Sequence, residues 1–126
     1  MFEVTVEAEF SAAHAIRGHA GQCAQLHGHT YRVAAVFVGD RLNELDMLLD
    51  FGEAKAIVAE VVGALDHTSL NELPAFQERN VTTENLARHI FQGIRHRLAA
   101  LPGQPRLGRV TVWEGPRSSA TYSEEP

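Results

Sequence analysis

The sequence predicts an α+β domain in which two helices pack against one face of a four-stranded antiparallel sheet. Two strand-like stretches open the chain, two stretches with helical periodicity follow, and two short strand-like stretches close it. The expected order is therefore strand, strand, helix, helix, strand, strand. A length of 126 residues is typical of a single domain, so we expect one domain over residues 1–126.

The first two strands have different signatures. Residues 2–10, FEVTVEAEF, alternate strictly between apolar and polar side chains, which indicates a strand with one buried face. The second run, residues 30–39 with the sequence TYRVAAVFVG, is rich in valine and aromatic residues. The outer edges of so small a sheet expose unpaired backbone groups, so we expect copies of the chain to associate.

The first helix is expected to begin near residues 50–52 and to stop around residues 66–67. Residues 68–80 are expected to form a loop, with Pro74 as a breaker. The apolar positions of the helix recur at helical spacing and form one stripe, made of Ala54, Ile57, Val58, Val61, Val62 and Leu65.

The second helix is expected to start at Thr82 or Thr83, because either side chain can cap it. Pro102–Gly103 is expected to end it. Two short strands, residues 106–114 and 118–123, complete the chain. The buried side of the helix is marked by Leu86, Ile90, Phe91, Ile94 and Leu98.

Composition disfavours partners and locations that need many basic residues or long apolar segments. The formal net charge is −5 and there is no basic run, which disfavours a nucleic-acid or anionic-membrane partner. No apolar run approaches the roughly 20 residues that a membrane helix needs. The single cysteine cannot form an internal disulfide and no secretory signal opens the chain, so we expect a cytoplasmic protein.

Residues 11–33 contain four of the seven histidines and the only cysteine. His27 and His29 are two apart, so both rings would project from one face if a strand begins there. His14, just past the end of the first strand, could arrive beside them and complete a three-ligand zinc site with an open fourth position. Imidazole also suits copper, iron or nickel, and His19 is a rival third ligand. Ordinary surface histidines are the alternative.

The sequence is compatible with three different roles for Cys23. It could be a fourth, thiolate ligand that closes a structural zinc site. It could be a reactive thiol whose pKa is lowered by the nearby cation. It could also be a small buried apolar residue, which is the common fate of a free cysteine.

Six motifs occur in a fixed order: FSAAH, C-x3-HGH followed by Tyr31, DFG..K, LDH..LN, T-x-EN and a late E…SSATY. Together they resemble the family of 6-pyruvoyl-tetrahydropterin synthase and 6-carboxy-tetrahydropterin synthase over residues 2–122. The resemblance implies the tunnelling fold, a four-stranded antiparallel sheet with two helices on one face. It also implies a homohexamer, in which two barrel-shaped trimers stack and the active sites lie between subunits.

The resemblance assigns roles to the candidate residues, although adjacent Asp66 and His67 would otherwise be taken as a helix end followed by a turn. Glu114 also attracts attention by itself, because a carboxylate at the end of an apolar strand face needs a partner. A pterin offers its 2-amino group and ring N–H as two parallel donors. The implied roles are zinc binding for His14, His27 and His29, catalysis for Cys23, Asp66 and His67, and substrate binding for Glu114, Thr82, Thr83 and Glu84.

The gap of three residues between Cys23 and His27 is similar to the bacterial 6-carboxy branch, which serves queuosine and deazapurine biosynthesis. That branch converts 7,8-dihydroneopterin triphosphate to 6-carboxy-5,6,7,8-tetrahydropterin, acetaldehyde and triphosphate. The alternatives are a 6-pyruvoyl-tetrahydropterin synthase, a non-catalytic pterin-binding zinc protein and a purely structural zinc protein.

Two departures from the family pattern bear on the substrate. Ala24 and Gln25 stand where members that handle a triphosphate often carry basic residues, and Val81 replaces a proline. If no other cation supplies the missing charge, we expect either a substrate without the triphosphate or a dominant pyruvoyl-type or sepiapterin-type side reaction. The cations that could supply it are Arg17, Arg32, Lys55 and Arg117.

Overall fold

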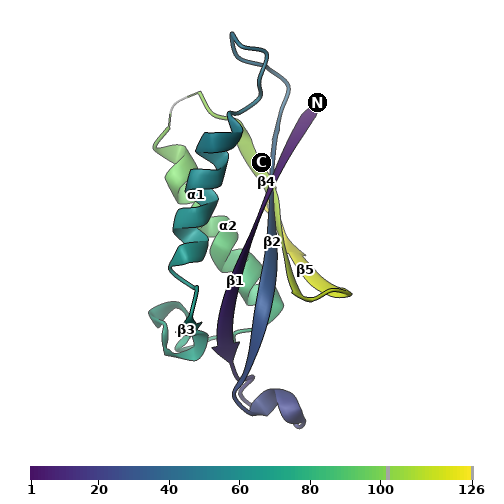
Figure 1. Ribbon diagram of the computed structural model, residues 1–126, viewed down its shortest axis with the longest axis vertical. Coiled ribbons are helices and arrows are strands. Elements are labelled where there is room, and N and C mark those ends of the chain that lie inside the picture. The colour runs from purple at the N-terminus through teal and green to yellow at the C-terminus, as the bar shows by residue number, and fades with distance from the viewer. Residues whose placement is uncertain (102, 126) are drawn as a thin grey trace.

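Five strands form one sheet, and two helices cover one of its faces (Figure 1). The structure is a computed structural model that describes residues 1–101 and 103–125. No helix among these residues is both long and apolar enough to cross a membrane. The elements are β1 (Phe2–His14), β2 (His27–Gly39), α1 (Phe51–Gly63), β3 (Thr68–Ser69), α2 (Thr83–Ala99), β4 (Arg106–Gly115) and β5 (Ser118–Tyr122).

The longest pairing in the sheet is the antiparallel ladder of β1 and β2. It runs without interruption from Phe2 opposite Gly39 to His14 opposite His27. Both strands are longer than the alternating pattern indicated, because the ladder continues through residues 11–14 and 27–29. His14 is therefore the last residue of β1 and does not lie beyond it.

The expected four-stranded antiparallel sheet is wrong in one respect. The strand order is β3-β1-β2-β4-β5, and β3 pairs parallel with β1 through Thr68 and Ser69, opposite Ala12 and Ala13. The sheet is therefore mixed, and a strand lies between the helices in the element order. A two-residue strand has no periodicity to detect, since it exists only where tertiary packing brings it against the free edge of β1.

Both helices begin with a side-chain cap. Asp50 accepts a hydrogen bond from the backbone N–H of Glu53 at 3.1 Å, and α1 ends at Gly63, before the expected residues 66–67. Thr82 accepts from the N–H of Asn85 at 3.1 Å, so Thr82 is the cap of α2. Gly103 follows the helix with φ +78°, whereas Pro102 lies outside the described residues.

The core lies between the helices and the sheet. Alternate residues of β1 and β2 enter it, and the rings of Phe10 and Tyr31 stack with centroids 4.9 Å apart. The opposite face of the sheet carries polar residues, including the ion pair of Glu7 with Arg32, whose guanidinium lies 3.8 Å over the Trp113 ring. The predicted alternation is thus confirmed, and it places the histidines on the core face where β1 ends and β2 begins.

Candidate metal and active site

Three histidines from neighbouring strands converge at this end of the sheet. His14 and His27 are paired across the ladder, and His29 follows on the same face of β2. Their ring centroids are 4.6 to 5.0 Å apart, and one nitrogen of each ring lies within 4.8 Å of the other two. Nitrogens this close to one another could all bind a single metal ion after small movements of the rings.

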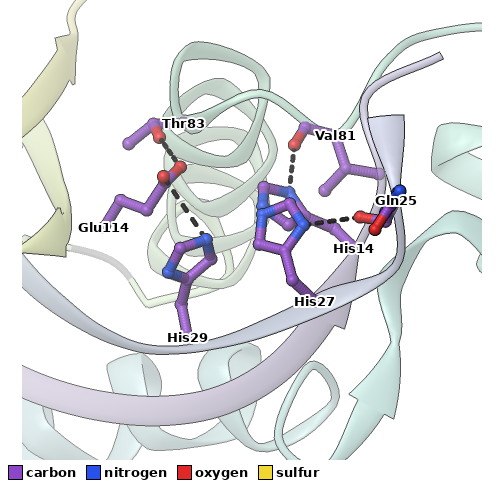
Figure 2. A network of polar contacts seen from close by, with 7 residues as sticks. All are labelled: His14, Gln25, His27, His29, Val81, Thr83 and Glu114. Carbon is purple, nitrogen blue, oxygen red and sulfur yellow. Dashed lines mark hydrogen bonds and ion pairs between the residues drawn. The ribbon is translucent and has the colours of Figure 1, made fainter. Parts of the chain in front are cut away.

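Backbone carbonyls orient two of the three rings (Figure 2). Nδ1 of His14 lies 2.6 Å from the carbonyl oxygen of Val81, and Nδ1 of His27 lies 2.7 Å from that of Gln25. A carbonyl only accepts, so each Nδ1 carries the proton and each Nε2 presents a lone pair. Carbonyl partners of this kind fix the tautomer in metal-binding histidines.

The donor atoms fit a cation. His14 is only 1% exposed, and the Nε2 atoms of His14 and His29 are buried without a hydrogen-bond partner among the described residues. Burial lowers the pKa of both side chains below the usual histidine value, which favours the neutral form that binds metal. Lone pairs buried in this way are costly unless an ion or another donor meets them.

Glu114 links the histidines to α2. Its Oε2 accepts a hydrogen bond from the Thr83 hydroxyl at 3.0 Å. Its Oε1 lies 3.3 Å from Nε2 of His29, although that contact is not aligned as a hydrogen bond. Thr82 is occupied as the helix cap, and Glu84 lies exposed in the first turn of α2. Of the expected substrate-binding residues, the structure therefore brings Glu114 and Thr83 together.

Cys23 lies in a short 3-10 turn, Gln22–Ala24, and is half-buried. It lines a cavity of about 470 Å³ together with His27, His29 and Glu114. The thiol is not part of the tight group of donor atoms that the three histidines form. His19 lies exposed in the same loop, where its Nδ1 accepts from the N–H of Gly21 at 2.9 Å, and it also lies outside that group.

The side chains of Asp66 and His67 are in direct polar contact. His67 Nδ1 lies 2.9 Å from Oδ2 of Asp66, and Oδ1 of Asp66 accepts from the N–H of Ser11 at 2.9 Å. The Ser11 amide, followed by His67, lowers the pKa of the Asp66 carboxyl. His67 has φ +58°, a left-handed conformation that is uncommon for histidine, and its N–H donates to the carbonyl of Ser11 at 2.6 Å. Strain of this kind is concentrated at functional sites.

His67 does not line the cavity that Cys23, His27 and Glu114 share. The His67 side chain is 82% exposed and borders another cavity with Ser11, Gly28, Thr30 and also His29. Ser11, Gly28 and Thr30 alternate with the three histidines along β1 and β2, whereas His29 itself lines both cavities.

The basic residues proposed to hold phosphates are mostly engaged elsewhere. Arg17 donates to the carbonyls of Phe76 and Arg79, and Arg32 pairs with Glu7 on the opposite face of the sheet. Lys55 lies exposed on α1. Arg117 lines a cavity together with His29 and Glu114.

Sequence reasoning missed some of the groups that support the site. The carbonyls of Gln25 and Val81 orient two rings, and carbonyls leave no mark in a sequence. Tyr31 was noted only as part of a motif. Its ring lies 5.5 Å from that of His29, and its hydroxyl is buried with no partner among the described residues. Burial raises the pKa of Tyr31, so the hydroxyl stays protonated and available as a donor.

Comparison with known proteins gives a consistent result. The family described as 6-pyruvoyl tetrahydropterin synthase matches residues 3–125. A Bacillus subtilis protein named 6-carboxy-5,6,7,8-tetrahydropterin synthase is 36% identical over an alignment of 126 positions that covers 96% of this chain and 84% of that protein. A Pyrococcus furiosus protein named dihydroneopterin monophosphate aldolase is 37% identical over 112 residues, 89% of each chain.

The fold has close structural counterparts. The structure of Caenorhabditis elegans 6-pyruvoyl tetrahydropterin synthase superposes with a TM-score of 0.84 at 26% identity, covering 99% of this chain and 98% of that one. A Plasmodium vivax 6-pyruvoyltetrahydropterin synthase gives a TM-score of 0.78 at 22% identity.

Proposed function

Because this chain belongs to the 6-pyruvoyl tetrahydropterin synthase family, we propose that it is a zinc-dependent carbon–carbon lyase of the 6-carboxy type. Its reaction converts 7,8-dihydroneopterin triphosphate to 6-carboxy-5,6,7,8-tetrahydropterin, acetaldehyde and triphosphate. The product would serve queuosine and other deazapurine synthesis in the cytoplasm. The named bacterial relatives support this branch.

One observation carries the proposal: a carboxylate, a thiol and two imidazoles line one cavity, and a third imidazole, that of His14, lies beside those two. His14, His27 and His29 would hold the zinc ion, which supplies Lewis-acid polarisation of the substrate's side-chain oxygens when bound. Cys23 and Glu114 line the cavity beside two of these ligands. The arrangement leaves a coordination position for substrate, as catalytic zinc sites do.

Glu114 would bind the pterin ring. Its two carboxylate oxygens match the parallel donors of the 2-amino group and ring N–H. The hydrogen bond from Thr83 fixes the carboxylate against the first turn of α2, so little freedom is lost when the ring arrives. Cys23, as thiolate, would then remove a proton from the substrate side chain.

Asp66 and His67 would complete the site from a second copy of the chain. In one chain His67 does not line the cavity that contains Cys23 and Glu114. Proton shuttling by an imidazole held by a carboxylate requires it to reach the substrate. We therefore propose that the active form is a homohexamer with sites between subunits.

A second candidate substrate is a pterin with a single phosphate. One relative is named dihydroneopterin monophosphate aldolase, and Arg117 is the cationic side chain that lines the cavity beside His29 and Glu114. One guanidinium is matched to one phosphate more naturally than to three.

The decisive experiment incubates zinc-loaded protein with dihydroneopterin triphosphate and, separately, with the monophosphate, and identifies the products by mass. Acetaldehyde with a carboxylated pterin supports the leading proposal. A pyruvoyl pterin indicates 6-pyruvoyl-tetrahydropterin synthase, and cleavage of the monophosphate alone indicates an aldolase. Unchanged substrates would leave a pterin-binding zinc protein. The Cys23→Ala variant serves as the control for contaminating activity.

A further inference from the structure

The three residues that follow His14 are held by two asparagine side chains. The amide of Asn71 contacts Ala15 twice: its Oδ1 accepts from the Ala15 N–H at 2.8 Å, and its Nδ2 donates to the Ala15 carbonyl at 2.9 Å. Asn80 repeats the arrangement at Arg17, with distances of 2.8 and 2.9 Å. Each side-chain amide thus pairs with a residue as a strand neighbour would.

Ile16, which lies between Ala15 and Arg17, binds the backbone of Cys23. The N–H of Ile16 donates to the carbonyl of Cys23 at 2.6 Å, which closes the loop that carries the thiol. Ala15 and Arg17 on either side are the residues that Asn71 and Asn80 hold. The backbone of Cys23 is therefore anchored to a short segment whose own position is fixed from the other side.

Two further contacts tie the same segment to the metal-binding end of the sheet. The Arg17 guanidinium donates to the carbonyls of Phe76 and Arg79, at 2.9 and 2.8 Å. Asn80 is followed by Val81, whose carbonyl accepts from Nδ1 of His14. One stretch of chain, residues 71–81, thus locates both the thiol loop and a candidate metal ligand.

We propose that Asn71 and Asn80 are positioning residues that hold the Cys23 thiol at its working place beside His27 and His29. This inference rests on the proposed function, because the work assigned to the thiol is proton removal from a metal-bound substrate. Residues 18–22 are exposed, so the position of this part of the loop depends on support at its two ends. A displacement of about 1 Å at a reacting group can lower a rate about 100-fold.

The test uses the fact that Cys23 is the only cysteine, so iodoacetamide labels one site. Asn71→Ala and Asn80→Ala are compared with wild type and with Asn43→Ala. Asn43 is a matched control, because its side chain also makes two backbone hydrogen bonds, accepting from the N–H groups of Leu45 and Met47, at the far end of the sheet. Asn71→Asp, which keeps the acceptor and loses the donor, replaces Asn71→Ala if that variant does not fold.

The measurements are the alkylation rate of metal-free protein, the zinc content, and kcat and KM of zinc-loaded protein. We expect Asn71→Ala to be alkylated several-fold faster and to lose about 10- to 100-fold in kcat with KM and zinc content nearly unchanged. Asn43→Ala should match wild type in all four, even if its Tm falls.

The proposal would be overturned if Asn71→Ala and Asn80→Ala both kept the wild-type alkylation rate and the wild-type kcat. So would a loss of kcat that only follows a loss of zinc, since the asparagines would then act on the metal ligands. If the wild-type protein turns over no pterin, the proposed function fails, yet the alkylation rates still decide whether the asparagines hold Cys23.

Discussion

The hydroxyl of Thr83 donates a hydrogen bond to Oε2 of Glu114 at 3.0 Å, joining the end of β4 to the first turn of α2. The other oxygen of the same carboxylate lies 3.3 Å from Nε2 of His29. The carboxylate therefore lies between the N-terminus of α2 and a candidate metal ligand, and the Thr83 hydroxyl orients it.

Glu114→Gln should weaken substrate binding, because one of the two acceptor oxygens becomes a donor facing the donors of the pterin. We expect kcat/KM to fall about 10- to 100-fold, mainly through KM, since charged hydrogen bonds contribute about 1.5–3 kcal/mol. Thr83→Val should have a smaller effect in the same direction. Steady-state kinetics check both, and an unchanged KM in Glu114→Gln would contradict the assigned role.

Replacing any one of His14, His27 and His29 by alanine should abolish stoichiometric zinc binding, because two imidazoles form a far weaker site. Metal analysis of dialysed protein measures this directly. His19→Ala is the matched control and should retain wild-type zinc content, since that ring lies outside the donor group. Removal of metal by a chelator should abolish turnover, and added zinc should restore it.

Cys23→Ala should keep zinc content and Tm close to wild type and lower kcat by about 100- to 10,000-fold, the usual contribution of a general base. The reason is that the thiol lines the cavity without joining the donor group. If zinc and Tm were lost together instead, Cys23 would be a structural ligand.

Mixing subunits should reveal whether Asp66 and His67 act on a neighbour. Cys23→Ala and His67→Ala are each expected to be inactive, because each lacks a catalytic group. Co-expressed, they form mixed assemblies in which some sites receive an intact thiol from one chain and an intact His67 from another, so activity should reappear. Co-expression of Cys23→Ala with Cys23→Ser should restore nothing. Recovery no greater than in that pair would place both groups on the same chain.

The metal-free protein should lose stability as the pH falls. Burial lowers the pKa of His89, whose ring lies 5.3 Å from that of Phe76. The folded state thus resists protonation that the unfolded chain accepts at about pH 6.5, so its stabilisation is full above that pH and is lost below it.

His89→Leu should therefore reduce the fall in the free energy of unfolding between pH 7 and 5, measured by urea denaturation of metal-free protein. His96→Leu, a change at an exposed position of the same helix, should keep the wild-type pH dependence. A part of the fall should persist in His89→Leu, because burial also lowers the pKa of His14 and His29.

Local patterns predicted the parts of the fold that depend on local chemistry. The alternation of residues 2–10, the apolar stripe of α1 and the threonine cap of α2 all follow from neighbours in sequence. The convergence of the three histidines also followed, because strand geometry fixes which side chains share a face.

Other features depend on which segments meet in space. The strand β3 exists through its pairing with Ala12 and Ala13. The asparagines that hold Ala15 and Arg17 act across more than fifty residues, and nothing around them in sequence indicates this. The position of His67 beside β1 likewise follows from its tertiary pairing with Ser11.

The β1–β2 ladder closes with His14 opposite His27, and this separates two kinds of sequence change. An insertion within either strand turns every later side chain to the other face, so it would scatter the imidazoles. An insertion at residues 18–22, which lie between Arg17 and Cys23, leaves both strands in register. Changes in the length or sequence of that stretch can therefore shift the position of the Cys23 thiol while the three histidines keep their places in the ladder.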